Sequence, residues 1–268
     1  MKIKRSDRTA VIAKILTENP GKVFPLNYFA ELLNSAKSST SEDIMTIKET
    51  FKKLNLGIVE TLPGAAGGVR YKPYKVKSNI EKFLTEIKNK LVEPKRIIPG
   101  GFIYMTDLIF CPATAFKIGE IFATKFSQTN PDYVLTVETK GIPIALMTAR
   151  CFDVPLVIAR RDSRVTEGTS VSINYISGSS KRIQTMSLPR RALKEGSNVL
   201  VIDDFMKGGG TARGMIELMN EFNAEVVGIG VLVATKKPEQ KLVKDFLPLF
   251  VLNDIEEDSG RIDISIKP

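Results

Sequence analysis

The sequence predicts an α/β protein of two domains, in which a small helical domain precedes a larger domain built around a parallel sheet. Three observations lead to this prediction. The first 75 residues show three amphipathic helices followed by a hairpin signal. From about residue 100 onward, buried-type strands alternate with helices, which is typical of a parallel sheet covered on both faces. The length of 268 residues suits two domains, which we place at 1–75 and 76–268.

The small domain is expected to begin with three short helices, because apolar residues recur at helical spacing. Their expected ranges are 7–18, 25–34 and 39–55. Ser39 is expected to cap the third helix, with Glu42 completing a capping box three residues later. The side chains of this helix that are expected to face inward are Ile44, Ile47, Phe51 and Leu54.

After the third helix, "IVETLPGAAGGVRYK" shows two β-type runs around a turn, which indicates a hairpin. Three helices followed by a hairpin predict a winged helix-turn-helix, with the third helix in the major groove of DNA and the hairpin as the wing. The candidate base-reading residues are Ser39, Thr40, Ser41 and Thr46. The candidate phosphate contacts are Lys37, Lys52, Arg70 and Lys72. The alternative is a helical protein-interaction module whose charges only solvate its surface.

The distribution of charge favours a phosphate-rich partner. The chain has 39 Lys and Arg against 30 Asp and Glu, a formal net charge of +9. Residues 1–75 hold 13 basic and 7 acidic residues, so most of the excess lies in the small domain. A local basic excess is typical of nucleic-acid binding, although charge alone is weak evidence for it.

Several classes of protein are excluded or disfavoured by composition. The chain has no histidine and only two cysteines, Cys111 and Cys151. Ser-His and Cys-His catalysts are therefore excluded, and a zinc site or a disulfide framework is disfavoured. No apolar run reaches the ~20 residues that span a bilayer, and the first residues show no signal-peptide core. We expect a cytoplasmic protein without a membrane partner and without a metal site of its own.

The larger domain is expected to open with an amphipathic helix over 77–92 and to continue as a parallel α/β sheet. The expected strands are 133–137, 155–159, 198–203 and 225–234, and the expected helices are 114–126, 142–152 and 211–222. Ligands of such sheets bind beyond the carboxyl ends of the strands. Asp203 and Asp204 stand at such an end.

The stretch "NVLVIDDFMKGGGTARGMIELMNEF" (198–222) contains the residues best suited to bind a ligand. Gly208–Gly210 allow a tight turn that exposes backbone N–H groups, and the helix that follows favours a phosphate at its start. The two carboxylates suit the hydroxyls of a sugar, or Mg²⁺. A Walker A motif is absent, and the dinucleotide fingerprint fails because Arg213 replaces its last glycine. A sugar phosphate or nucleotide is the ligand that this corner implies.

"VLVIDDFMKGGGTA" resembles the phosphoribosyl-pyrophosphate (PRPP) motif of the type I phosphoribosyltransferases. The resemblance covers about residues 100–260 and implies that family's fold, a parallel sheet flanked by helices. It implies ribose contacts by Asp203 and Asp204 within a motif that continues through Phe205 and Met206. It implies a 5′-phosphate loop made of Lys207, Gly208, Gly209, Gly210, Thr211 and Ala212. "VETKGIP" resembles the family's pyrophosphate loop, which implies Glu138, Thr139, Lys140 and Gly141; Arg160 and Arg161 could also reach pyrophosphate.

A winged helix ahead of such a domain is similar to the purine operon repressors of Gram-positive bacteria, over the full length. This resemblance implies a homodimer that binds double-stranded operator DNA and represses purine biosynthesis and transport genes. PRPP is then the effector that weakens operator binding, with or without Mg²⁺, and no residue is catalytic.

The first rival is an active purine (xanthine-like) phosphoribosyltransferase with an N-terminal appendage. The sequence after Ile255 offers no clear aromatic to stack on a base, which disfavours that rival. A second rival is a PRPP-sensing scaffold that binds protein rather than DNA. Residues 160–183 lie where phosphoribosyltransferases have a mobile loop, and the longer segment 160–191 holds 7 basic and 2 acidic residues. It could extend the DNA footprint, close over PRPP or simply be solvated.

Overall fold

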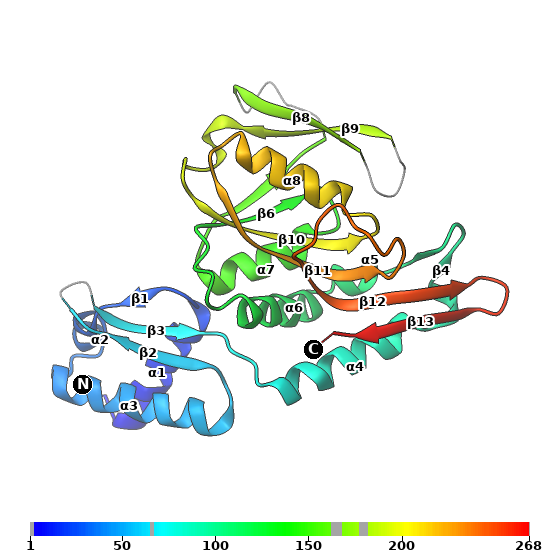
Figure 1. Cartoon of the computed structure of the whole chain (residues 1–268). Coiled ribbons are helices and arrows are strands. Elements are labelled where there is room, and N and C mark those ends of the chain that lie inside the picture. Colours follow the sequence, from blue (N-terminus) through cyan, green and yellow to red (C-terminus); the bar gives the residue numbers. More distant parts are fainter. Residues whose placement is uncertain (1–2, 65–66, 162–167, 177–181, 268) are drawn as a thin grey trace. The chain divides into compact units, whose positions relative to one another are not determined.

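The computed structural model describes residues 3–64, 67–161, 168–176 and 182–267. It contains two compact units (Figure 1). The first consists of residues 1–76 together with 150–153, and the second consists of 77–149 and 154–268. Within the described ranges, no helix is both long and apolar enough to cross a bilayer.

The first unit has the order of elements of a winged helix-turn-helix. Its elements are α1 (Arg5–Glu18), β1 (Val23–Phe24), α2 (Leu26–Leu32), α3 (Lys37–Leu54), β2 (Ile58–Leu62) and β3 (Gly68–Lys72). The three helices and the hairpin were all expected from the apolar spacing. The short strand β1 was not expected; it pairs with β3, so that the wing is a three-stranded antiparallel sheet in the order β1-β3-β2.

The apolar stripes of the three helices meet the inner face of this small sheet. Ile12 and Leu16 of α1 and Phe29 of α2 are fully buried, and Ile44 and Ile47 of α3 are buried in the same cluster. Burying such side chains provides the main favourable term in folding a domain of this size. The turn between α2 and α3 is held by the Ser35 N–H, which donates to the Ala30 carbonyl at 3.0 Å. This geometry fixes α3 against α1 and α2.

Two details of α3 were predicted wrongly. The helix begins at Lys37 after Ala36, so Ser39 lies inside the first turn and is not the cap. The earlier start is consistent with the hydroxyl pair of Ser35 and Thr40, 2.9 Å apart, which links the turn to the helix. Leu54, expected to face inward, is 58% exposed because the helix ends there and Asn55 takes a left-handed conformation.

The second unit begins with α4 (Lys77–Leu91) and ends with an antiparallel strand pair. Before the sheet come η1 (Pro94–Arg96), β4 (Ile97–Ile98), β5 (Phe102–Ile103), α5 (Thr106–Ile109) and α6 (Pro112–Lys125). The remaining elements are β6 (Tyr133–Val137), α7 (Ile142–Phe152), β7 (Leu156–Ala159), β8 (Ser170–Ile176), β9 (Ile183–Pro189), η3 (Arg190–Ala192), β10 (Asn198–Met206), α8 (Gly210–Asn220), β11 (Glu225–Thr235), β12 (Leu247–Glu256) and β13 (Arg261–Ile266). As predicted, strands alternate with helices through most of this unit.

The central sheet has the strand order β13-β12-β11-β10-β6-β7. All neighbours are parallel except β12 and β13, so five strands end at the same edge. Along the chain, β7 is added beside β6 at one edge of the sheet, and β11 and β12 are added beside β10 toward the other edge. The order therefore reverses between β6 and β10, and in open α/β sheets such a reversal leaves a crevice at the carboxyl ends of the two strands.

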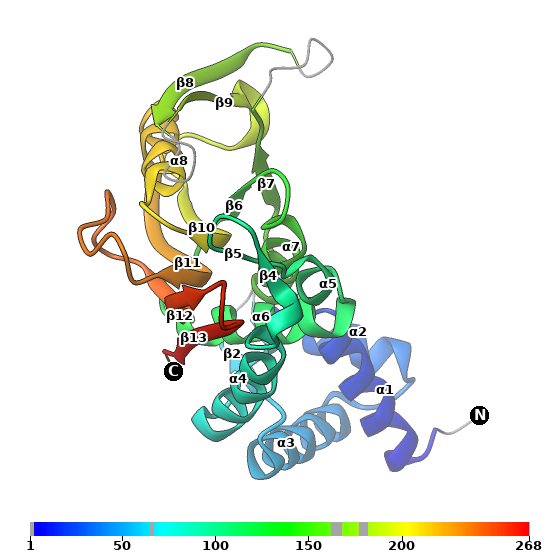
Figure 2. The ribbon, with the colours of Figure 1, turned by 90° about the vertical axis from the view of Figure 1, so that its right-hand side faces the viewer.

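Helices cover both faces of the sheet (Figures 1 and 2). On one face, Met215, Leu218 and Met219 of α8 pack into the main apolar cluster. On the other face, α6 approaches β11 so closely that a Cβ at Gly230 would lie 2.8 Å from the Phe122 ring. Packing on both faces explains why the strands read as continuous apolar runs rather than as alternating patterns.

The strands at the end of the chain were not foreseen from the sequence. β12 and β13 extend the sheet, and α4, the helix predicted over 77–92, lies beside β13 (Figure 2). The described parts of the basic segment form the hairpin β8–β9, which lies against α8 (Figures 1 and 2). No secondary structure was predicted for 170–176 and 183–189, and 162–167 and 177–181 lie outside the described residues.

Candidate functional site

The crevice at the reversal point is bounded by the turn after β6 and by the loop from β10 into α8. The first holds Glu138–Gly141 and the second holds Asp203–Ala212. The two approach closely, because a Cβ placed on Gly141 would lie 3.2 Å from Asp203 Oδ1. The structure thus brings together the two segments that sequence motifs had assigned to one ligand.

The acidic pair ends the apolar run of β10 in an environment that is poor in water. Asp203 is only 5% exposed and Asp204 is partly buried. Burial raises the pKa of Asp203 well above its usual range, and the Asp204 carboxylate raises this pKa further. Burial also raises the pKa of Asp204, against the lowering effects of a hydrogen bond with Asp203 and of the Lys140 ammonium. Each carboxylate therefore gains from a partner that donates a hydrogen bond to it or from a nearby cation.

The turn at Gly141 packs closely on the end of β6. The Thr136 hydroxyl of β6 is fully buried and has no hydrogen-bond partner. A Cβ on Gly141 would lie 2.5 Å from this hydroxyl oxygen, so the backbone of the turn packs directly against it. An unsatisfied buried hydroxyl costs free energy unless a ligand or water completes its hydrogen bond. The structure therefore requires glycine at position 141, where the turn meets Thr136 and Asp203.

The glycine loop presents backbone N–H groups to the same crevice. Gly209, at φ +82°, occupies a left-handed conformation that residues with a side chain rarely adopt, and α8 begins immediately after it. The carbonyls of Lys207 and Gly208 accept hydrogen bonds from Lys241 Nζ at 2.6 Å and from the Leu242 N–H at 3.0 Å. Because N–H and C=O point in opposite directions across a trans peptide, the N–H groups of Gly208 and Gly209 point away from Lys241 and Leu242. Like the N–H groups in the first turn of α8, they are donors of the kind that bind anions at the start of a helix.

The side chains of the motif do not all reach the ligand space. Met206 is 3% exposed and belongs to the apolar cluster under α8, so only its backbone can contribute to the crevice. Phe205 and Thr211 are partly buried, and Ala212 is buried. The Lys207 ammonium lies 5.4 Å from the centre of the Phe102 ring of β5. Phe102 was not singled out in the sequence, because its place beside the loop depends on tertiary structure.

The predicted pyrophosphate contacts lie together at the end of β6 and β7. Thr139 and Lys140 are exposed, and Glu138 is partly buried. The Glu138 carboxylate accepts a hydrogen bond from the Arg161 N–H at 2.9 Å, which ties the two strand ends together. The backbone of Arg160 pairs with Ser187 of β9, so the arginine pair is anchored between the sheet and the hairpin.

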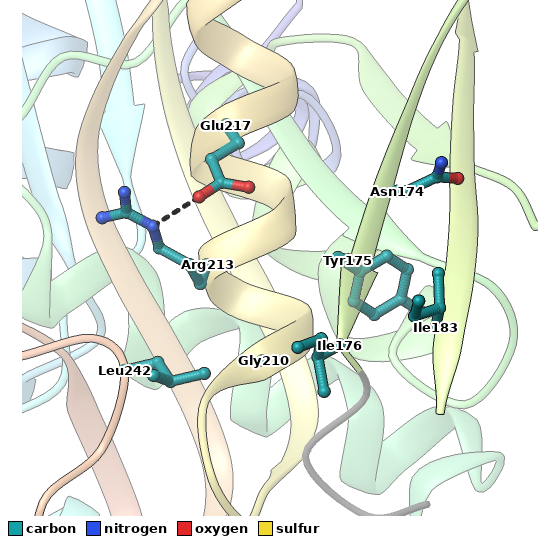
Figure 3. A pocket seen from close by; sticks show the side chains of 8 residues that line it. All are labelled: Asn174, Tyr175, Ile176, Ile183, Gly210, Arg213, Glu217 and Leu242. Carbon is teal, nitrogen blue, oxygen red and sulfur yellow. Dashed lines mark hydrogen bonds and ion pairs between the residues drawn. The ribbon is translucent and has the colours of Figure 1, made fainter. Parts of the chain in front are cut away.

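A cavity of about 340 Å³ lies on the outer side of α8, between this helix and the hairpin (Figure 3). Tyr175 of β8 lines it and packs against α8, where a Cβ on Gly214 would lie 3.0 Å from the tyrosine. The Tyr175 hydroxyl donates to the Gln184 side-chain oxygen at 2.8 Å. The cavity touches Gly210, but neither aspartate lines it, so it is not the ligand crevice.

On α3, the candidate base readers have different positions. Thr40 is completely buried, with its hydroxyl engaged by Ser35 and by the Ala36 carbonyl, so its assignment as a base reader is wrong. Ser41 and Thr46 are exposed, and Ser39 is partly exposed. Met45, which is 54% exposed, lies on the outward side and was missed because a methionine within an amphipathic helix usually indicates packing.

The candidate phosphate contacts fall into two groups. Lys37 and Lys52 are exposed on α3. Arg70 and Lys72 on β3 are instead engaged by Glu60 of β2, which lies directly opposite Arg70. Arg70 Nη2 and Lys72 Nζ lie 2.8 and 3.0 Å from the Glu60 carboxylate oxygens. Burial raises the pKa of Glu60, but hydrogen bonds from the two cations outweigh it and leave the pKa below its usual value.

Comparison with known proteins agrees with this architecture. Residues 4–73 match the family described as "Bacterial purine repressor, N-terminal", and residues 108–266 match "Phosphoribosyl transferase domain". The chain is 48% identical over 264 residues to the purine biosynthesis transcriptional repressor PurR of Bacillus subtilis, covering 98% of this chain and 93% of that protein. It is 40% identical over 264 residues to the purine biosynthesis transcriptional activator PurR of Lactococcus lactis, covering 98% and 97%.

Among solved structures, the chain is similar to adenine phosphoribosyltransferase from Thermoanaerobacter pseudethanolicus. The TM-score is 0.54 at 20% identity, over 63% of this chain and 98% of that one. At this identity the likeness shows the fold alone. The full-length similarity to the regulators, together with both domain matches, shows that the chain belongs to the family of bacterial purine repressors, in which a winged helix-turn-helix precedes a phosphoribosyltransferase fold.

Proposed function

We propose that this protein is a DNA-binding repressor of purine biosynthesis and transport genes, and that PRPP bound in the second unit weakens its hold on operator DNA. The observation that carries the proposal is the combination in one chain of two modules. One is a winged helix whose α3 has an exposed face, and the other is a parallel sheet that carries an acidic pair and a glycine loop at its reversal point. The relative in B. subtilis is named a repressor of purine biosynthesis, which supports the direction of regulation.

PRPP fits the crevice by its chemistry. Its ribose hydroxyls would donate to Asp203 and Asp204, and its 5′-phosphate would accept from the N–H groups around Gly209. Its pyrophosphate would face Lys140 and the turn at Glu138–Gly141. Within the described part of the chain, no group of three or more metal-ligating side chains gathers. Mg²⁺ would therefore be held by the two aspartates and by oxygens of PRPP, and it would neutralise phosphate charge.

Binding at the crevice can weaken DNA binding only if PRPP prefers the state of the protein that binds DNA poorly. The coupling is reciprocal, so DNA must lower the affinity for PRPP by the same factor. We also propose that the repressor acts as a homodimer, because paired winged helices read two half-sites of an operator.

The test of the DNA-binding claim is a titration of two fluorescently labelled fragments with the full-length protein, followed by anisotropy. One fragment is the promoter upstream of the purine biosynthesis genes of the same genome, and the other is a scrambled version. We expect tighter binding to the promoter, with affinity that falls steeply as salt rises, by a log–log slope of about −0.9 for each phosphate contacted. Equal, salt-insensitive binding to both fragments would refute the proposal.

The second candidate function is purine phosphoribosyl transfer, which the fold and the acidic pair favour. We propose that the chain binds PRPP without transferring it. The test is a chromatographic assay for nucleotide formation from PRPP and Mg²⁺ with adenine, guanine, hypoxanthine or xanthine. We expect no product above the rate of a protein-free control; sustained turnover with any base would establish an enzyme.

Replacing Gly141 with alanine is expected to weaken PRPP binding by at least about tenfold, because the new methyl group would occupy the space above Thr136 and next to Asp203. Isothermal titration calorimetry with PRPP and Mg²⁺ measures this change. The double variant Gly141→Ala with Thr136→Ala removes the closest contact and should recover part of the affinity. An unchanged affinity in the single variant would place the ligand elsewhere.

Replacing Glu60 with glutamine is expected to strengthen binding to DNA, because it frees Arg70 and Lys72 for phosphates without changing the size of the side chain. The salt dependence should steepen by about 0.9 for each additional phosphate that these two cations bind. Anisotropy titrations across a range of salt concentrations provide both values. Glu49→Gln on α3 removes the same charge away from the wing and serves as the control. If both substitutions strengthened DNA binding equally, the gain would come from the lost negative charge in general and not from freeing Arg70 and Lys72.

A further inference from the structure

The N-terminal end of α1 holds two arginines that meet α3 in different ways. Both approach Asp43, an aspartate of α3 that is completely buried. Arg8 Nε lies 2.7 Å from Asp43 Oδ2, and the Arg8 side chain is only 15% exposed. Arg8 Nη1 also donates to the Ile3 carbonyl at 3.2 Å. A buried carboxylate needs a cation at hydrogen-bonding distance, and Arg8 supplies it.

Arg5 lies at the outer rim of the same contact. Its Nε is 3.3 Å from Asp43 Oδ1, and its Nη2 donates to the Thr46 hydroxyl at 3.0 Å. The Arg5 side chain nevertheless remains 60% exposed. Thr46 is itself exposed on α3, so the guanidinium of Arg5 extends the surface of this helix rather than its core.

This division leaves Arg5 with only a small structural role. Ion pairs of exposed side chains contribute about 0–1 kcal/mol. Arg8 neutralises the buried carboxylate at the shorter distance, and the Asp43 Oδ1 atom that Arg5 approaches makes no hydrogen bond. A guanidinium has five N–H donors, and the described contacts of Arg5 engage two of its nitrogens. Its planar fork is held in place at one edge and open at the other, an arrangement suited to a phosphate oxygen.

The charges around Arg5 are mixed. Lys4 is exposed beside it and adds positive charge. Asp7 is also exposed in this turn, but its carboxylate accepts a hydrogen bond from the Ser6 hydroxyl at 3.1 Å rather than pairing with Arg5. On α3, Glu42 is exposed one turn before Thr46. A single phosphate contact at the flank of α3 is therefore favoured over a broad basic patch.

We propose that Arg5 contacts the DNA backbone beside the face of α3 that enters the groove, whereas Arg8 has a structural role only. This inference rests on the proposed DNA-binding function and adds α1 to an interface otherwise assigned to α3 and the wing. A backbone contact positions α3 along the duplex without reading sequence.

The test uses full-length protein with Arg5→Gln, Arg5→Lys and, as a matched control, Lys14→Gln. Lys14 is an exposed cation farther along α1 that pairs with Glu18, so its removal changes the net charge equally. Affinities for the promoter fragment and for a scrambled fragment are measured by anisotropy over a range of salt concentrations. Thermal unfolding of each variant is recorded in parallel.

For Arg5→Gln we expect weaker binding to both fragments by a similar factor, a salt slope shallower by about 0.9, and an unchanged unfolding temperature. Arg5→Lys should keep most of the slope, and Lys14→Gln should behave as wild type. An unchanged slope in Arg5→Gln, or a loss confined to the promoter fragment, would overturn the backbone contact while leaving the DNA-binding function intact. If the wild-type protein bound neither fragment, both proposals would fall together.

Discussion

Replacing both Asp203 and Asp204 with asparagine is expected to give a protein that binds operator DNA as tightly as wild type but keeps it when PRPP is added. The substitutions preserve shape while removing the negative charges that the ribose hydroxyls, or Mg²⁺, would meet. Allosteric couplings typically amount to about 1–3 kcal/mol, so PRPP should raise the wild-type dissociation constant for DNA by about 5- to 150-fold. In the double variant the ratio should fall to about one.

Anisotropy titrations of the promoter fragment, with and without millimolar PRPP and Mg²⁺, measure this ratio. Asp258→Asn in the turn between β12 and β13 is the control, because it is an exposed aspartate outside the crevice. Normal release of DNA by the double variant would show that the acidic pair does not hold the effector.

The acidic pair also makes stability depend on pH in a predictable direction. Because burial raises the folded-state pKa of Asp203 above that of the unfolded chain, the folded protein binds its proton more tightly. The stabilising effect of this proton is complete below the ordinary carboxyl pKa and is lost as pH rises through the raised value. Asp203→Asn should therefore be more stable than wild type at neutral pH. Urea unfolding across the pH range would contradict this if both proteins showed the same dependence.

Replacing Arg8 with methionine is expected to loosen the winged helix strongly, because Asp43 would remain as a buried carboxylate without its closest cation. Removing one partner of a buried ion pair costs about 3–5 kcal/mol, and Arg5 at 3.3 Å moderates the loss toward the lower end. About 3 kcal/mol corresponds to roughly a 150-fold increase in the population of molecules whose winged helix is locally unfolded. The affinity for operator DNA should fall as this population grows.

Hydrogen exchange followed by mass spectrometry on the intact protein locates the effect. Peptides from α1 and α3 should exchange faster, whereas peptides from β10 and β11 should not change. The double variant Arg8→Met with Asp43→Leu replaces the pair with apolar side chains and should recover most of the protection. If Arg8→Met left α1 and α3 as protected as in wild type, the ion pair would have no role in fixing α3.

Local sequence patterns predicted the winged helix and the crevice, because their signals lie within single segments. Apolar residues at helical spacing identify α1 to α3, and the order of an apolar strand, two aspartates and three glycines identifies the loop from β10 to α8. β1, with two residues, is too short for any periodicity, and it exists only because β3 offers it an edge. β8 (SVSINYI) alternates polar and apolar side chains, a pattern typical of a half-buried strand, but no secondary structure was assigned to it from the sequence. The surface that it packs on is α8, and that contact depends on tertiary structure.

Within the site, sequence reasoning identified residue types better than their roles. It placed Asp203 and Gly141 in one site without showing that they meet over Thr136. It assigned Thr40 to base reading because it is polar, although the turn at Ser35 buries it. It treated Arg70 and Lys72 as available for phosphates, whereas their strand partner Glu60 holds both. Cross-strand and interhelical partners of this kind depend on tertiary register, which local spacing does not encode.

The central claim is that a ligand bound in the crevice lowers the affinity of the winged helix for DNA. The most direct measurement is a titration of the wild-type protein onto the labelled promoter fragment at fixed salt, repeated at PRPP concentrations from zero to millimolar. The account predicts that the dissociation constant for DNA rises and then levels off as the crevice saturates, and that saturating DNA lowers PRPP affinity by the same factor. Tight promoter binding that stays constant across the whole range of PRPP would contradict it.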